Sequence, residues 1–138
     1  MIRFLLDTNV ISEAVKAKPN KAVMRKLRMH QEEIATASPV WHELQFGCYR
    51  LPVSRKRSIL KSFLSDVVRP SMEILPYDEA AAEWHADQRA RLNTIGKPPS
   101  FVDGQIAAIA KVNQLILVTR NVSDFEVFSE LDLQNWHE

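Results

Sequence analysis

Short apolar runs alternate with segments of helical periodicity along this chain. The expected strands are residues 2–6, 33–38, 72–77, 115–119 and 131–136, and the expected helices are residues 9–16, 19–30, 38–51, 54–68, 79–93 and 101–112. Strands separated by helices favour a parallel sheet with helices on both faces. Right-handed crossovers then bring the carboxyl ends of the strands to one edge. The sequence predicts an α/β fold with a short central parallel sheet in a single domain, residues 1–138.

Composition narrows the class of protein further. The chain has 138 residues, 46% hydrophobic and 25% charged, which is typical of a soluble globular domain. No apolar run approaches the roughly 18–20 residues that span a membrane, and the first ten residues lack the pattern of a signal peptide. Cys48 is the only cysteine, so no internal disulfide is possible. These features predict a cytoplasmic protein without membrane contact.

Several kinds of site are excluded by missing motifs. Neither G-x-G-x-x-G nor G-K-[ST] occurs, so the usual dinucleotide and P-loop phosphate sites are absent. The four histidines show no H-x-x-x-H spacing, and with one cysteine a zinc site of nitrogen and sulfur ligands is disfavoured. Any metal ion would have to be held by oxygen atoms.

Basic residues concentrate in the first half of the chain. Residues 14–61 contain 11 Lys or Arg against 3 Asp or Glu, although the net charge is only +1. Such a stretch suits a phosphate-bearing partner. Arg25, Lys26, Arg55 and Arg57 are candidate contacts to the phosphates of such a partner. The alternative is that they belong to solvated helix faces.

Four carboxylates are candidates for chemistry. Asp7 ends the first strand, Glu43 lies one turn into the helix after the second, Asp103 lies in the first turn of the helix before residues 115–119, and Asp124 follows that strand. In a parallel sheet the ligand crevice lies beyond the strands' carboxyl ends. We therefore expect the four side chains to approach one another there.

Each carboxylate also has a local explanation. Asp7 would cap the following helix, and Ser100 with Asp103 resembles a capping box. Asp124 would stabilise a turn with Asn121 and Ser123. Glu43 is a lone exposed side chain in this alternative.

Taken together, the four carboxylates indicate a site for a hard cation. Like charges a few ångströms apart disfavour joint ionisation, and a divalent cation removes that cost. Mg²⁺ and Mn²⁺ prefer oxygen ligands and orient phosphate and activate water in phosphodiester cleavage. Asp7, Asp103 and Asp124 are the predicted metal ligands, with Glu43 as a further catalytic carboxylate. Supporting polar groups are predicted at Asn9, Thr119 and Asn121.

Four motifs carry a resemblance across nearly the whole chain. They are "LLDTNVIS" at the start, "SPVWHELQFG" with Glu43, "FVDGQIAAIA" with Asp103, and "LVTRNVSDF" with Asp124. In order and spacing they resemble the PIN-domain ribonucleases, and specifically the VapC toxins of toxin–antitoxin pairs. The resemblance implies a three-layer PIN-like sandwich and a Mg²⁺- or Mn²⁺-dependent endoribonuclease that cleaves transfer or ribosomal RNA to arrest growth.

The resemblance also implies partners. It implies a VapB-type antitoxin, a homodimer, and a larger complex with the antitoxin on operator DNA. An amphipathic helix in an apolar groove would suit such a partner. The sequence predicts this groove along the early helices, at Val10, Val23, Leu27, Phe46 and Leu51.

Two other functions remain open at this point. One is a binding module that grips nucleic acid or protein with its basic face and cleaves nothing. The other is a phosphatase of the haloacid dehalogenase type, which also places an aspartate after its first strand. That chemistry needs a second aspartate where Asn9 stands, and a lysine near a final acidic pair where Arg120 and one acid stand.

Overall fold

A parallel sheet of five strands forms the centre of the computed structural model, which describes residues 1–138. The strands are β1 (Phe4–Leu6), β2 (Ile34–Ala37), β3 (Glu73–Leu75), β4 (Ile116–Val118) and β5 (Leu133–Gln134), in the order β3-β2-β1-β4-β5. Leu6 in the central strand pairs with Thr36 of β2 and with Val118 of β4. The residues that follow these three positions therefore emerge together at one edge of the sheet.

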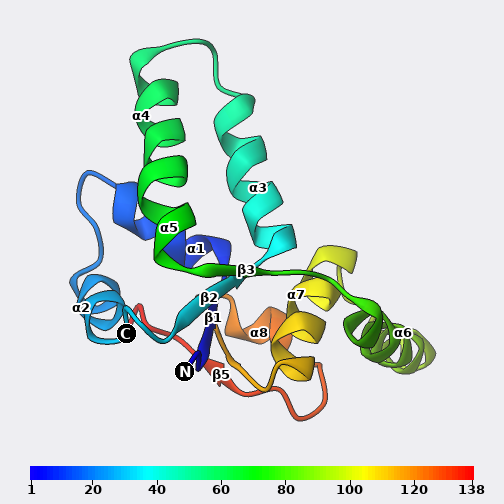
Figure 1. The fold of residues 1–138 in the computed structure, drawn as a ribbon. Coiled ribbons are helices and arrows are strands. Elements are labelled where there is room, and N and C mark those ends of the chain that lie inside the picture. The colour runs from blue at the N-terminus through cyan, green and yellow to red at the C-terminus, as the bar shows by residue number, and fades with distance from the viewer.

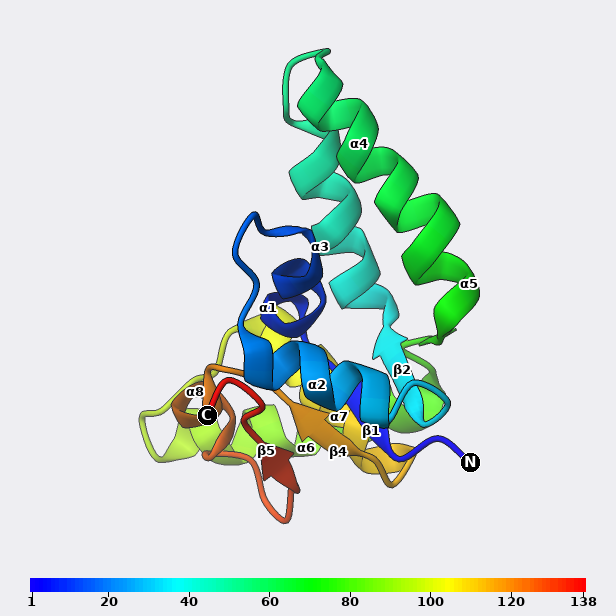
Figure 2. The same ribbon diagram turned by 90° about the vertical axis from the view of Figure 1, so that its left-hand side faces the viewer.

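Helices cover both faces of the sheet, as the alternation of segments predicted. They are α1 (Thr8–Ile11), η1 (Ser12–Val15), α2 (Lys21–Met29), α3 (Ser38–Tyr49), α4 (Arg55–Phe63), η2 (Leu64–Val68), α5 (Arg69–Ser71), α6 (Glu79–Thr94), α7 (Phe101–Val112) and α8 (Val122–Phe125). α2 lies in front of the strands in Figure 2, with α6 and α7 behind them. α3 and α4 form a pair that projects beyond the sheet (Figure 1). None of these helices has the length and apolar character needed to cross a membrane.

The core explains why the strands read as continuous apolar runs. Every residue of β1 and β2 is buried, because helices cover both faces of a parallel sheet. The one polar residue in these strands is Thr36, whose hydroxyl donates to the carbonyl oxygen of Leu6 at 2.9 Å. Helical spacing predicts an apolar stripe of Val40, Leu44, Cys48 and Leu51; the first three are buried on α3, whereas Leu51 lies beyond its end and is half-buried.

Some expected helix boundaries were wrong. The Ser38-Pro39 pair predicts Ser38 as the N-cap of α3 with Pro39 as its first residue, but Ser38 lies within the helix and its side chain makes no capping hydrogen bond. The reason is that β2 runs to Ala37 and turns directly into α3, whose first turn tolerates Pro39 because that position needs no N–H partner. The expected helix over residues 9–16 is split between α1 and the tighter η1, and the short helix α8 was not expected at all.

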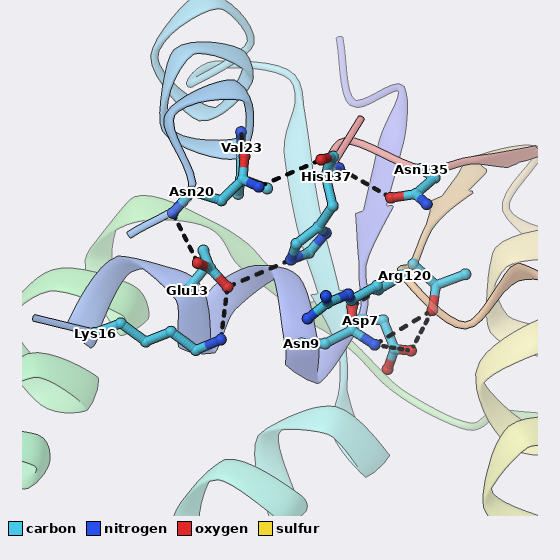
Figure 3. A network of polar contacts seen from close by, with 10 residues as sticks. Asp7, Asn9, Glu13, Lys16, Asn20, Val23, Arg120, Asn135 and His137 are labelled. Carbon is cyan, nitrogen blue, oxygen red and sulfur yellow. Dashed lines mark hydrogen bonds and ion pairs between the residues drawn. The ribbon is translucent and has the colours of Figure 1, made fainter. Parts of the chain in front are cut away.

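A buried carboxylate ties the end of the chain to the segment between η1 and α2 (Figure 3). Glu13 is 4% exposed. Its oxygens lie 2.9 Å from Lys16 Nζ, 2.7 Å from the Asn20 backbone nitrogen and 3.4 Å from His137 Nε2. The Lys16 contact first, and the Asn20 N–H next, lower the pKa of Glu13 to about 2. Glu13 is therefore ionised in the folded protein at neutral pH.

We expect Glu13→Gln to lower the melting temperature at neutral pH, because the amide loses the charge that these donors stabilise. The pKa of Glu13 is depressed on folding, so its contribution is complete above the ordinary carboxyl pKa and disappears as pH falls toward 2. Thermal melts from pH 7 to pH 3 should show the difference between the two proteins shrinking. Glu83→Gln, at an exposed position of α6, is the control and should change little. A difference independent of pH would contradict this account.

Candidate active site

Asp7 leaves the centre of the sheet at its carboxyl edge and is held on several sides. Its backbone N–H donates to the carbonyl oxygen of Val118, which continues the pairing between β1 and β4. Its carboxylate accepts hydrogen bonds from the Thr119 hydroxyl at 2.8 Å and from the Thr8 backbone N–H at 2.8 Å. The second bond caps α1, so the local and the functional interpretations of Asp7 describe the same side chain. One oxygen orients the helix while the other faces the neighbouring strand end.

Asn9 links the ends of β1 and β4. Its amide nitrogen lies 3.5 Å from both Asp7 Oδ2 and Thr119 Oγ1, and its oxygen accepts from the Arg120 backbone N–H at 3.0 Å. Thr119, which is fully buried, also accepts the backbone N–H of Asn121 at 3.0 Å. Asn9 thus lies between Asp7 and Arg120 (Figure 3). Thr119 also holds the Asp7 carboxylate, and Asn121 takes part through its backbone N–H.

Glu43 and Asp103 line one hollow beside Asp7. This hollow, of about 410 Å³, lies between α3 and α7 and is lined by Pro39, His42, Glu43, Phe46, Ser100, Val102 and Asp103; we call it the α3–α7 hollow. Glu43 accepts a hydrogen bond of 2.7 Å from the Thr8 hydroxyl. Sequence analysis missed this role of Thr8, although Thr8 directly follows the candidate Asp7. The Ser100 hydroxyl accepts the Asp103 N–H at 3.1 Å, which confirms Ser100 as a helix cap.

Electrostatics couple the four candidate carboxylates. Burial is the main cause of a raised pKa at Asp103, and the charges of Asp7, Asp124 and Glu43 raise it further, against a hydrogen bond from Ser100. Burial also raises the pKa of Asp7, and Glu43 adds to this, while hydrogen bonds from Thr119, Thr8 and Asn9 oppose it. Asp7 and Asp103 therefore each ionise less readily than an isolated carboxyl group.

The carboxylates form an open cluster. No three Asp, Glu, His or Cys side chains lie close enough together to hold a metal ion in this arrangement. Asp124 is exposed in the first turn of α8, and its backbone N–H donates to the Asn121 carbonyl oxygen, as expected of a turn residue. The donors present are still oxygen atoms of carboxylates whose mutual repulsion a cation would relieve. They therefore fit Mg²⁺ or Mn²⁺ in chemistry.

The four basic candidates lie on two separate surfaces. Arg25 and Lys26 belong to α2, whereas Arg55 and Arg57 belong to α4, at the far end of the projecting pair (Figure 2). Arg25 lines a hollow of about 640 Å³, the basic hollow, with Lys18, Pro19, Lys21, Met24 and Arg28. Arg57 Cζ instead lies 5.7 Å from the centre of the Tyr49 ring. A single basic face is therefore not what the structure forms.

The predicted apolar groove was placed partly on the wrong residues. Val10 and Val23 are fully buried in the core and line no surface. Phe46 lines the α3–α7 hollow instead. Leu27 does line an apolar groove, together with Leu6, Ile11, Ala14, Met24, Arg28, Gln31, Ile34, Phe63, Val67, Val68, Ser71 and Met72. Helical spacing predicted apolar positions correctly but did not separate the face that packs inward from the face that stays open.

Known proteins share this arrangement over its whole length. The PIN domain model matches residues 4–131. "VapC ribonuclease Y4jK" of Sinorhizobium fredii is 37% identical, covering 95% of each chain. "tRNA(fMet)-specific endonuclease VapC" of Shigella flexneri is 31% identical, covering 99% of each. DNA-bound VapBC from Salmonella typhimurium has the same fold, with a TM-score of 0.84, 27% identity and 99% of each chain covered.

A five-stranded parallel sheet with acidic residues at its carboxyl edge is thus the architecture of a PIN domain. This chain belongs to the PIN-domain family, where its relatives are the VapC ribonucleases of toxin–antitoxin systems.

Proposed function

We propose that this chain is a metal-dependent endoribonuclease toxin that acts in the cytoplasm and is restrained by a cognate antitoxin. The observation that carries the proposal is the placement of carboxylates at the carboxyl edge of the sheet: Thr119 holds Asp7, the adjacent Thr8 holds Glu43, and Glu43 lines one hollow with Asp103. Family membership supports the same activity, since relatives of matching length are named ribonucleases. The relative from Shigella flexneri is named for tRNA(fMet), which favours a transfer RNA among the possible targets.

In this proposal each residue of the cluster has a task. Asp7, Asp103 and Asp124 would hold Mg²⁺ or Mn²⁺, and the cation would supply the charge that orients the phosphate and activates water. Thr119 and Asn9 orient the Asp7 carboxylate through the hydrogen bonds described above. Thr8 holds Glu43 at the mouth of the α3–α7 hollow, where its carboxylate is placed to accept a proton. Arg25 and Lys26, or Arg55 and Arg57, would contact phosphates farther along the RNA.

The direct test is cleavage of purified bulk transfer RNA and ribosomal RNA. We expect cleavage with Mg²⁺ or Mn²⁺, none with excess EDTA, and recovery when the metal is restored. Undiminished cleavage in EDTA would refute the metal dependence. Binding of RNA without cleavage under every metal condition would favour the non-catalytic binding module instead.

The apolar groove suits the antitoxin. It lies beside the basic hollow, and Met24 and Arg28 line both. An amphipathic segment with apolar anchors and neighbouring acidic side chains would therefore match this surface. The structural relative VapBC is bound to DNA, and we propose the corresponding assembly here, with a homodimer of this chain, its antitoxin and operator DNA.

We expect a small protein encoded next to this chain to co-purify with it and to block its ribonuclease activity. The test is co-expression with an affinity tag on this chain only. Met24→Glu would place a like charge beside any acidic partner and should abolish co-purification, whereas the exposed Met29→Glu on the same helix should not. If the neighbouring product neither co-purifies nor relieves growth arrest, the toxin–antitoxin assignment fails, even where the nuclease assignment survives.

A further inference from the structure

An exposed aromatic ring stands beside the candidate carboxylates without a role in the proposed chemistry. Phe46 is 57% exposed on α3, whereas Val40 and Leu44 of the same helix are buried. It lines the α3–α7 hollow together with Glu43 and Asp103, so its ring borders the same space as two of the four carboxylates. An apolar ring left open to water at such a place calls for a ligand with an apolar face.

The surroundings of Phe46 define what that ligand would be. His42 lies one turn earlier, with its ring centre 6.5 Å from that of Phe46 and nearly perpendicular to it. Arg50 lies one turn later, with its Cζ 5.9 Å from the centre of the Phe46 ring. The face of α3 thus presents a ring flanked by an imidazole and a guanidinium. Aromatic rings combined with cations bind single-stranded nucleic acids, since bases stack on the rings and phosphates meet the cations.

The opposite wall of the hollow completes a slot. Val102, at the start of α7, is 44% exposed and lines the hollow across from α3. α3 and α7 are in contact and come close at this end of the sheet (Figure 1). The volume of about 410 Å³ lies within the range of small-molecule sites and accommodates a nucleotide. A base between Phe46 and Val102 would leave its own phosphate near Glu43 and Asp103.

The geometry points to a base-stacking subsite, in which Phe46 holds an unpaired nucleobase adjacent to the scissile phosphate. This inference rests on the proposed ribonuclease function. A base inside a duplex is already stacked on both faces, so the subsite selects RNA that is single-stranded at the cut. Phe46 is a positioning residue, and stacking tolerates different bases because every base has a π-face. The Arg50 guanidinium meets the next phosphate along the strand.

The test measures kcat and KM with Mg²⁺ on a single-stranded RNA of about 12 nucleotides, and on a series in which each base in turn is removed to leave an abasic site. Phe46→Ala should raise KM by about 5- to 150-fold, the range for loss of one stacked base, with a smaller effect on kcat. Phe46→Trp should restore KM, and Ile59→Ala, which alters an exposed apolar side chain of α4, should have no effect.

The abasic series identifies the contact. At one position of the RNA, removal of the base should raise KM of the wild type by the same factor as Phe46→Ala raises it on intact RNA. The same abasic RNA should not raise KM of the Phe46→Ala variant further, because both changes delete one contact. Independent losses at every position would overturn the inference. So would a Phe46→Ala protein that is monomeric where the wild type is dimeric and whose loss does not depend on the base, since Phe46 would then contact a second copy of the chain.

Failure of the ribonuclease proposal gives a different result. If the wild type cleaves none of these RNAs, fluorescence anisotropy with the intact 12-mer and its abasic series decides on the subsite alone. Binding that weakens on Phe46→Ala and at one abasic position would retain the stacking site without the nuclease. If Phe46→Ala leaves binding unchanged, both the stacking subsite and the ribonuclease proposal are refuted.

Discussion

Asp103→Asn should abolish RNA cleavage while the protein remains folded. Replacement of residues that merely support metal ligands costs about 10- to 100-fold in activity, so loss of a direct ligand should exceed about 100-fold. The metal-free variant should melt at the same or a higher temperature than the wild type. Burial and the charges of Asp7, Asp124 and Glu43 raise the pKa of Asp103, so its ionised form opposes folding at neutral pH.

The direction of the Asp103 pKa shift determines how this stability difference depends on pH. A carboxyl group whose pKa is raised on folding destabilises the protein above that pKa, and the cost disappears as pH falls through it. Asp103→Asn should therefore be most favourable near neutral pH in EDTA and lose its advantage in acid. Asp7→Asn should also abolish cleavage, with a smaller gain in stability, because Thr119 and Thr8 donate to the Asp7 carboxylate. Either variant with full activity would remove that residue from the site.

Gly104→Ala should destabilise the protein strongly. A Cβ at this position would lie 2.5 Å from His85 Cδ2 and closer still to Nε2. His85 is 1% exposed, and its Nδ1 is hydrogen-bonded to the Tyr77 hydroxyl at 2.8 Å, so its ring has no free path. Overpacking of this kind costs about 1–3 kcal/mol, and we expect the upper end here. The α7 segment that carries Asp103 would shift, so cleavage should fall as well.

Gly47→Ala is the matched control for this substitution. Gly47 lies inside α3, and a Cβ added there would meet no atom within 4 Å, so alanine should stabilise the helix by about 0.5–1 kcal/mol.

The double variant Gly104→Ala with His85→Ala should be more stable than the sum of the two single effects predicts, by about 0.5–3 kcal/mol. Urea unfolding of the wild type, Gly104→Ala, His85→Ala and the double variant measures this coupling. Strict additivity would show that the His85 ring does not oppose a side chain at position 104.

The sequence by itself determined which polar residues end neighbouring strands. An apolar strand that ends before Asp7 and another that ends at Thr119 must place both residues at one sheet edge when the strands are parallel. The helix caps at Asp78 and Ser100 accept N–H groups three residues away, so local spacing predicts them, although the same reasoning was wrong for Ser38. Burial of one face of α3, with one residue on each turn, likewise follows from helical periodicity.

Tertiary structure alone decided the long-range partners. Glu13 contacts His137, which lies near the other end of the sequence. His85 of α6 occupies the space that a side chain at Gly104 of α7 would need. It also decided that Val23 packs inward while Leu27, one turn later on α2, stays at the groove. These outcomes depend on how elements sit against one another. Periodicity reports only which face of an element is apolar, and carries no information about the residue that a distant element brings to that face.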